Sequence, residues 1–262
     1  MFKPIVTAIL CLPALFLFPA TAQETELTLD QIIQKHTDAA GGADKLKAIQ
    51  SVKASGNASL MGGQMEAPVT MTMKRPNSMR LEMSVQGKSF IQAFDGTTAW
   101  TINPFMGSND AQKSSDDDTK TAREHTDFVE GPLVDYKTKG HTVELIGKED
   151  VEGSPAYKLK ITRKGGSVEY AYLDAGTFLT IRSTSKRVQM GQDLDLESNL
   201  GNYKAVNGVM MPFSIDQKNA GKPLMQLTVE KYEVNIPADD TLFRMPEKPK
   251  EEAPKEKPAA KP

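Results

Sequence analysis

The sequence predicts a mainly β protein with a few helices, built on a single curved antiparallel sheet. In many short segments apolar residues alternate with polar ones, as at Met79, Leu81, Met83 and Val85, and this period of two is typical of strands with one apolar and one solvated face. Turn dipeptides separate these segments, and hairpins are their natural connections. They are Gly62-Gly63, Gln86-Gly87, Asp95-Gly96, Gly165-Gly166, Asn207-Gly208 and Ala220-Gly221. About ten strands are expected.

The amino terminus has the features of an export signal. Lys3 precedes an apolar run over residues 5–18, and Ala20-Thr21-Ala22 supplies the small residues that signal peptidase recognises. Residues 1–22 are therefore predicted to be a signal peptide cleaved near Ala22, which makes the mature protein periplasmic. The run is shorter than the roughly 20 residues that a membrane span needs. The single cysteine, Cys11, lies in this run after the large Leu10, which disfavours lipid attachment to its thiol.

Two short helices are expected before the first strand. Thr28 and Gln31 have the spacing of a capping box at a helix start. The segment that follows is amphipathic and carries Ile32 and Ile33 on one face. Gly41-Gly42 is expected to end this helix, and a second, shorter one follows.

The middle of the chain interrupts the strand pattern. Residues 108–121 are rich in Ser, Asp and Asn and are predicted to form a loop inserted over the sheet. Asp116-Asp117-Asp118 lacks the spaced oxygen ligands and closing Glu of an EF-hand, which favours a solvated loop over a calcium site. The next segment, with Phe128 and Leu133, is expected to be a helical or loop element that covers part of the sheet.

Three motifs together resemble a known family. They read K-R-P-N at 74–77, D-G-x-x-x-W at 95–100 and N-P-F at 103–105. They resemble the periplasmic outer-membrane lipoprotein carriers of the LolA/LolB-like family, best over residues 64–105, and residues 242–246 look like that family's closing strand. The resemblance implies an incomplete barrel lidded by helices over residues 23–246, with a cavity for the acyl chains of lipoproteins. It also implies two partners, an inner-membrane donor transporter and an outer-membrane acceptor.

Methionines gather beside the first of these motifs. Because methionine is unbranched and polarizable, it adapts to flexible chains, although it is also an ordinary core filler. The residues that we expect to line a lipid-binding groove are Met71, Met73, Met79, Leu81 and Met83.

Arg75 is the polar residue that stands out beside this groove. Its planar fork of donors suits the backbone carbonyls of a lid, and in the resembling family the arginine of this motif links the sheet to the lid and favours the closed, empty state. The alternative is an arginine at a strand end in water. The lid residues expected are Ile32, Ile33, Phe128 and Leu133. Trp100, the only tryptophan, is expected in the core.

Other classes of function find little support. The three histidines, His36, His125 and His141, are far apart and have no metal-like spacing, and no nucleophile-elbow pattern occurs. We therefore predict no enzyme, no cofactor and no metal. A net charge of -2 disfavours nucleic acid as a partner.

The sequence thus predicts a monomeric periplasmic carrier that binds acyl chains of lipoproteins or lipids for delivery to the outer membrane. The alternative is a lipid- or lipoprotein-sensing regulatory module with the same fold. Residues 247–262, a mixture of Lys, Glu, Pro and Ala, are predicted to be a disordered tail. Its nearly balanced charges favour a solubilising role over a tether.

Overall fold

The computed structural model describes residues 26–125, 127–189 and 191–247. The strands in these ranges are β1 Ser51–Leu60, β2 Met65–Lys74, β3 Ser78–Val85, β4 Lys88–Phe94, β5 Ala99–Asn103, β6 Ser108–Lys113, β7 Thr142–Val151, β8 Ser154–Thr162, β9 Val168–Asp174, β10 Thr180–Gln189, β11 Gln192–Gly201, β12 Lys204–Val206, β13 Val209–Met211, β14 Ser214–Asn219 and β15 Lys222–Val234. The helices are α1 Leu29–Ala39, α2 Ala43–Ala48 and α3 Asp116–His125, with 3-10 turns η1 Met61–Gly63, η2 Pro104–Met106 and η3 Asp240–Leu242. The predicted signal peptide and all but the first residue of the predicted tail lie outside the described residues.

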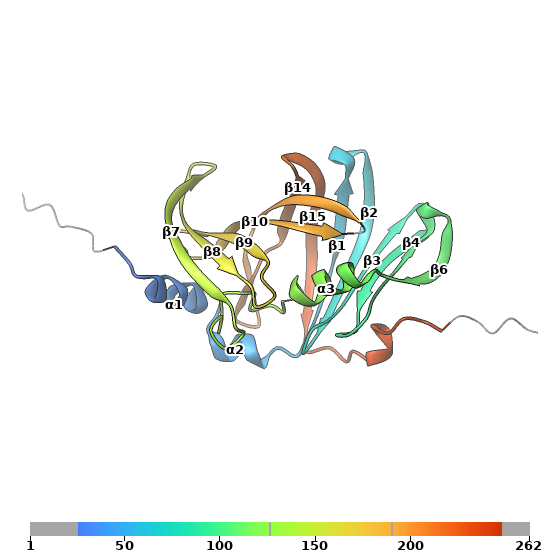
Figure 1. Ribbon diagram of the computed structural model, residues 1–262, viewed down its shortest axis with the longest axis horizontal. Helices are drawn as coiled ribbons and strands as arrows, with labels where there is room; N and C mark the ends of the chain where they lie inside the picture. The colour runs from blue at the N-terminus through green and yellow to red at the C-terminus, as the bar shows by residue number, and fades with distance from the viewer. Residues whose placement is uncertain (1–25, 126, 190, 248–262) are drawn as a thin grey trace, which may run out of the picture.

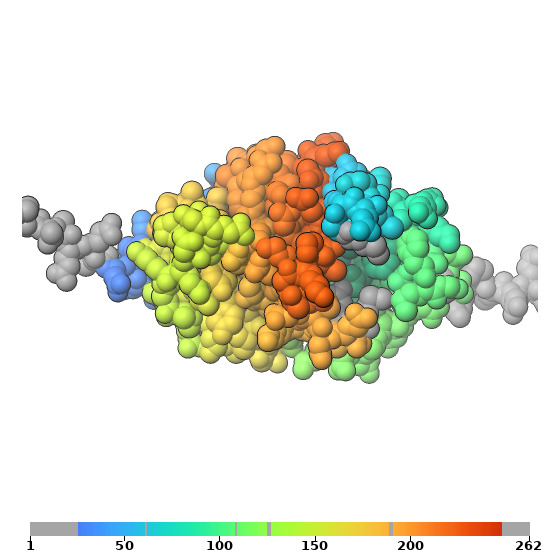
Figure 2. Space-filling model, turned by 90° about the horizontal axis from the view of Figure 1, so that it is seen from above, coloured from blue at the N-terminus to red at the C-terminus, as the bar shows by residue number. Residues whose placement is uncertain are grey.

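Thirteen strands form one antiparallel sheet in the order β6-β5-β4-β3-β2-β1-β15-β14-β11-β10-β9-β8-β7, and β12 and β13 form a separate hairpin. The sheet is curved and does not close into a barrel, because β6 and β7 remain as its two edges (Figure 1). Seen from above, β7 and β8 lie at one side, β14 and β15 near the middle and β3–β6 at the other side (Figure 2). The predicted single curved antiparallel sheet is confirmed, but the predicted number of strands was too low.

The hairpins lie where the turn dipeptides predicted them. Gln86 and Gly87 join β3 to β4 with φ values of 50° and 75°. Positive φ at both central residues is the geometry that matches the twist of paired strands. Asn207-Gly208 and Ala220-Gly221 have the same pair of positive angles. Local turn chemistry therefore defines these connections.

Helix α1 covers one end of the sheet. Its capping box is formed as predicted, since Thr28 N donates to Gln31 Oε1 at 2.8 Å and Gln31 N donates to Thr28 Oγ1 at 3.3 Å. The helix ends before Gly41, where a Cβ would lie 2.4 Å from the Gly208 carbonyl oxygen. Its buried face packs on the inner face of β7–β9, in a cluster that contains Ile32, Ile33, Tyr157, Leu159, Ile161, Ala171 and Leu173.

The segment predicted as an acidic loop is instead a strand and a helix. Residues 108–113 form edge strand β6, and Asp116-Asp117-Asp118 is the first turn of α3. The Ser115 hydroxyl accepts from the Asp118 N–H at 3.0 Å, and carboxylates are favourable near the positive end of the helix dipole. Helix α3 contacts β10 on one side and β4 and β5 on the other, so it crosses in front of the open sheet (Figure 1).

The closing segment also differs from its prediction. Residues 242–246 do not form a strand, because η3 precedes Phe243 and the chain after it runs without regular structure. Phe243 is buried, and Trp100 Nε1 donates to its carbonyl oxygen at 2.7 Å. Trp100 is completely buried, as predicted.

In two segments the alternation of apolar and polar residues does not predict the observed arrangement. Tyr170 and Tyr172 lie on the outer face of β9 with Val151 and Ala156, while the inner face carries Ala171 and Leu173. Both faces of this strand are apolar. Residues 209–215 are divided between β13 and β14, which belong to different sheets.

Within the described ranges, no helix has the length and apolarity to cross a membrane.

Candidate functional site

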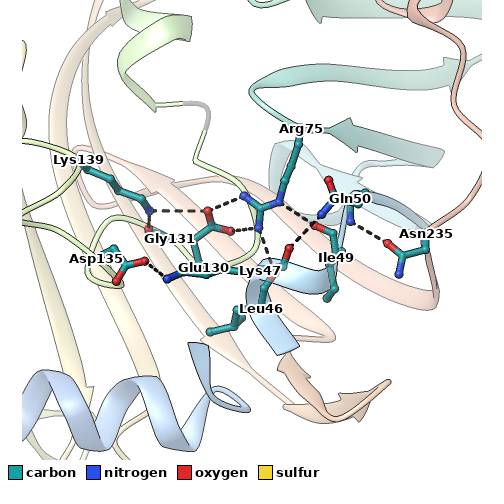
Figure 3. A network of polar contacts seen from close by, with 10 residues as sticks. All are labelled: Leu46, Lys47, Ile49, Gln50, Arg75, Glu130, Gly131, Asp135, Lys139 and Asn235. Carbon is teal, nitrogen blue, oxygen red and sulfur yellow. Dashed lines mark hydrogen bonds and ion pairs between the residues drawn. The ribbon is translucent and has the colours of Figure 1, made fainter. Parts of the chain in front are cut away.

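Arg75 lies where the sheet meets the covering elements (Figure 3). Its Nε donates to the Ile49 carbonyl oxygen at 2.8 Å, and Nη2 donates to that of Leu46 at 3.0 Å, both at the end of α2. Its two terminal nitrogens form a bidentate pair with Glu130, at 2.9 and 2.8 Å. The guanidinium also lies 4.5 Å from the centroid of the Phe128 ring. One side chain of the sheet thus joins α2 to the segment after α3.

That segment, residues 127–141, runs back over the sheet as a series of turns and is called the lid loop below. Its Phe128 packs with Leu46, Val52 and Met73 in one cluster. Leu133 packs in the α1 cluster instead. The residues predicted for the lid, Ile32, Ile33, Phe128 and Leu133, are therefore buried over two neighbouring parts of the sheet.

A cavity of about 330 Å³ lies under the lid loop. Its walls come from α1, the lid loop, the strands β8–β11 and the region after β11, with His36, Phe128, Leu133, Ile161, Leu200 and Tyr203 among the lining residues. This volume is within the roughly 300–1,000 Å³ that is usual for small-molecule sites.

The five residues predicted for the groove lie on the inner face of β2 and β3, outside the wall of this cavity. Met73 packs under Phe128. Met71, Leu81 and Met83 are half-buried members of a third cluster around Ala54 and Val69. Met79 is also half-buried. Their role in binding lipid stays a prediction.

A charged network connects the lid loop to the inner face of the sheet. Arg163, whose side chain is 5% exposed, pairs with Asp127 of the lid loop and with Glu169 of β9, the latter at 2.8 Å. Its Nη1 donates to the Glu124 carbonyl oxygen at 2.6 Å. Burial raises the pKa of the Glu169 carboxyl, although Arg163 acts against this shift.

Glu130 and this network were not predicted from the sequence. Arg163 could have been found from the strand pattern. Every second residue from Tyr157 to Ile161 on β8 points inward, and Arg163 is a charged residue at the next inward position. Glu130 had no such signal, since it lies 55 residues from Arg75 in a segment without regular structure. Across the described ranges, no group of three His, Cys, Asp or Glu side chains is placed to hold a metal ion.

His36 lies in the cavity wall and leads to a prediction about pH. Its Nδ1 is 2.8 Å from the Phe178 carbonyl oxygen, and burial lowers the pKa of the imidazole although this hydrogen bond raises it. Below the unfolded value of about 6.5 the unfolded chain takes up a proton that the native state does not. We expect the free energy of unfolding to fall from about pH 7.5 to about pH 5.5, with a contribution from His36 of at most about 1.4 kcal/mol per pH unit.

Urea denaturation at the two pH values measures this contribution. The variant His36→Gln should flatten the pH dependence, because glutamine keeps a donor for Phe178 but does not titrate. The pKa of the less buried His141 is also lowered, by burial first and then by Arg163, so His141→Gln serves as the comparison and should flatten the dependence less. An unchanged pH dependence in His36→Gln would contradict the assignment.

The architecture defines a class of protein. An open, curved antiparallel sheet whose inner face is covered by α1, α2 and a crossing segment is the LolA-like fold, and this chain has it. No protein-family model matches the chain, and no curated protein matches it.

Solved structures show the likeness in fold. A domain named as an outer membrane lipoprotein-sorting protein, from Vibrio parahaemolyticus, is 13% identical, with 81% of this chain and 94% of that chain covered and a TM-score of 0.53. A LolA superfamily protein from Nitrosomonas europaea is 14% identical over 84% and 98% of the two chains, with a TM-score of 0.53. A DUF1329 family protein from Desulfovibrio piger is 12% identical over 82% and 96%, with a TM-score of 0.54.

Proposed function

We propose that the protein is a periplasmic carrier that binds acyl chains of lipoproteins or lipids on the inner face of its sheet and delivers them to the outer membrane. The observation that carries this proposal is an apolar inner face that is only half-buried beside a cavity covered by the lid loop. Similarity in fold to an outer membrane lipoprotein-sorting domain supports it.

The apolar inner face extends across four strands. Strand register places Tyr232, Ala54, Met71 and Leu81 in one row across β15, β1, β2 and β3. The adjacent row ends in Met83, opposite Val69. Three members of the first row are only half-buried. An acyl chain that covers these half-buried apolar rows removes them from water, and this burial lowers the free energy of the complex.

The lid supplies a means of control. Its contacts with Arg75 stabilise the closed, empty protein, and a chain that enters beneath it exchanges those contacts for apolar burial. A ligand that binds the open form better shifts the population toward it. In the function proposed, a membrane donor loads the carrier and an outer-membrane acceptor unloads it, and the carrier itself performs no chemistry.

Uptake of a fluorescent fatty acid by the delipidated protein tests the binding surface. The double variant Met71→Gln/Leu81→Gln changes two residues that face each other across β2 and β3 on the inner face. Its affinity for the probe should fall about tenfold, which corresponds to about 1.4 kcal/mol. The matched control, Thr70→Gln/Glu82→Gln, changes the adjacent register pair on the other face of the same strands, and its affinity should remain close to that of the wild type.

The location of the groove would be contradicted if both double variants bound the probe equally well. No uptake by the wild type would contradict the carrier itself. A second arm measures transfer of the bound probe to acceptor vesicles, because a carrier releases its ligand to a membrane whereas a regulatory module that senses lipid is not required to do so.

A further inference from the structure

A second pocket, of about 700 Å³, lies on the other side of the lid loop. Its walls come from α3, the lid loop and the turn after β8. It shares Asp127, Phe128 and Glu130 with the cavity described above, so one short segment of the chain separates the two spaces. The lysine and arginine side chains in its lining distinguish this pocket from the first.

Positive charges dominate this lining. The pocket is lined by five cations, against three carboxylates, in a protein whose net charge is -2. The cations are Lys120, Arg123, Lys139, Arg163 and Lys164. The protein thus concentrates positive charge here although its overall balance is slightly acidic.

The carboxylates near the lid are occupied. Asp127 pairs with Arg163, and Glu130 pairs with Arg75 at 2.8 Å. Lys139 lies 3.9 Å from Glu130, and burial lowers the pKa of its amine against the pull of Asp127 and Glu130. The carboxylates near Lys139 do not fully offset the cost of burying its charge. An anion in the pocket would therefore stabilise the charged form of Lys139.

Three cations at the rim have no carboxylate partner within the described ranges. Lys120 and Arg123 are three residues apart on α3 and therefore lie on one side of the helix. Lys164 lines the same pocket from the turn after β8. Arg123 makes one long hydrogen bond, at 3.4 Å, to the Thr97 carbonyl oxygen. All three residues are exposed, and their donors are available to a ligand.

A close contact joins α3 to the turn that carries Lys164. The Glu124 side chain lies against Gly165, where a Cβ would be 1.9 Å from the Glu124 Oε1 atom. A side chain at position 165 would displace the Glu124 carboxylate. His141 Nδ1 accepts from the Lys164 N–H at 3.1 Å, so the neutral ring carries its proton on Nε2 and is a further donor in the wall.

We propose that this pocket binds an anionic head group of phosphate type, belonging to the ligand whose acyl chains occupy the inner face of the sheet. This inference rests on the proposed function. Phe128 lines the pocket and packs on Met73 of the inner face, so a head group in the pocket would lie beside an acyl chain on that face. The inference assigns the cargo to a chemical class, an acyl chain that ends in a phosphate ester. Lysine and arginine donors are the usual partners of such oxygens.

The experiment uses the delipidated protein and isothermal titration calorimetry. The probes are sn-glycerol 3-phosphate, inorganic phosphate and a single-chain alkyl phosphate, with a monoacylglycerol of the same chain length as the uncharged comparison. The pocket variant is Lys120→Gln/Arg123→Gln/Lys164→Gln. The control variant is Lys88→Gln/Lys186→Gln/Lys222→Gln, which removes the same charge from exposed residues outside the pocket lining.

We expect the alkyl phosphate to bind the wild type about tenfold more tightly than the monoacylglycerol, a difference of about 1.4 kcal/mol. The pocket variant should lose this preference, and its affinity for the monoacylglycerol should stay unchanged. The control variant should keep the preference. Affinity for glycerol 3-phosphate should fall in the pocket variant alone.

Other outcomes overturn the proposal and separate it from the proposed function. Equal binding of the alkyl phosphate and the monoacylglycerol by the wild type would eliminate the head-group site but leave the carrier intact. Tighter binding of inorganic phosphate than of either ester would identify free phosphate as the ligand and overturn the lipid source. Binding of glycerol 3-phosphate without uptake of any acyl probe would overturn both the lipid source and the carrier.

Discussion

Replacing Arg75 by leucine should destabilise the empty protein and strengthen its hold on lipid. The substitution leaves Glu130, whose side chain is 11% exposed, and two carbonyl oxygens without their donor. Removal of one partner from a largely buried pair costs about 3–5 kcal/mol, and since the Arg75 side chain is 23% exposed we expect about 2–4 kcal/mol. The loss applies to the closed form, so the open form becomes relatively more populated.

Two measurements on the same variant distinguish a contact that stabilises only the closed, empty state from one that stabilises every state. If the Arg75 contacts exist only in the closed, empty state, the melting temperature of the delipidated variant falls while that of the lipid-loaded variant does not. Affinity for the acyl probe should then rise by about tenfold or more. A fall in both melting temperatures with unchanged affinity would show that the Arg75 contacts do not stabilise the closed, empty state selectively.

Conservative and matched variants refine this result. Arg75→Lys keeps the charge but loses the planar fork, so it should be intermediate in both measurements. Arg80→Leu is the matched control. Arg80 lies on the other face of the sheet, is 18% exposed and pairs with Glu82 at 3.0 Å. Its loss should lower stability without changing affinity for the probe.

Replacing Arg163 by methionine should cost about 3–5 kcal/mol, because two carboxylates would remain together in a buried place without a cation. The pKa of Glu169 is already raised by burial, and Arg163 opposes the shift. Without Arg163 the carboxyl in the native state titrates at a higher pH still. A carboxyl whose pKa is raised on folding contributes stability below the unfolded pKa and loses it as pH rises through the folded pKa.

The deficit of Arg163→Met should therefore be smaller at about pH 5 than at about pH 8, as measured by urea denaturation at each pH. Arg182→Met is the control, since Arg182 lies on the outer face of the adjacent strand β10 and pairs with the exposed Glu152 at 2.8 Å. Because Glu152 is 67% exposed, Arg182→Met should lose less stability than Arg163→Met, and the loss should be the same at either pH. An Arg163→Met deficit that does not depend on pH would contradict the role of Glu169.

Prediction from the sequence succeeded where neighbouring residues contain the information. The capping box of Thr28 and Gln31, the hairpin at Gln86-Gly87 and the burial of Trp100 follow from propensities that act over a few residues. It failed at Asp116-Asp117-Asp118 because acidic residues suit a solvated loop and the first turn of a helix equally well. The packing of α3 on β10 favours the helix over the loop.

By itself the sequence determined the class of fold, an open antiparallel sheet with one apolar face and short covering helices, because alternation and turn chemistry are local. Only the tertiary structure decided which charges meet. Arg75 reaches Glu130 across 55 residues, and Arg163 reaches Asp127 and Glu169 from different elements. Period two divides a strand into two faces, but register and sheet curvature decide which face is enclosed and which distant side chains share it.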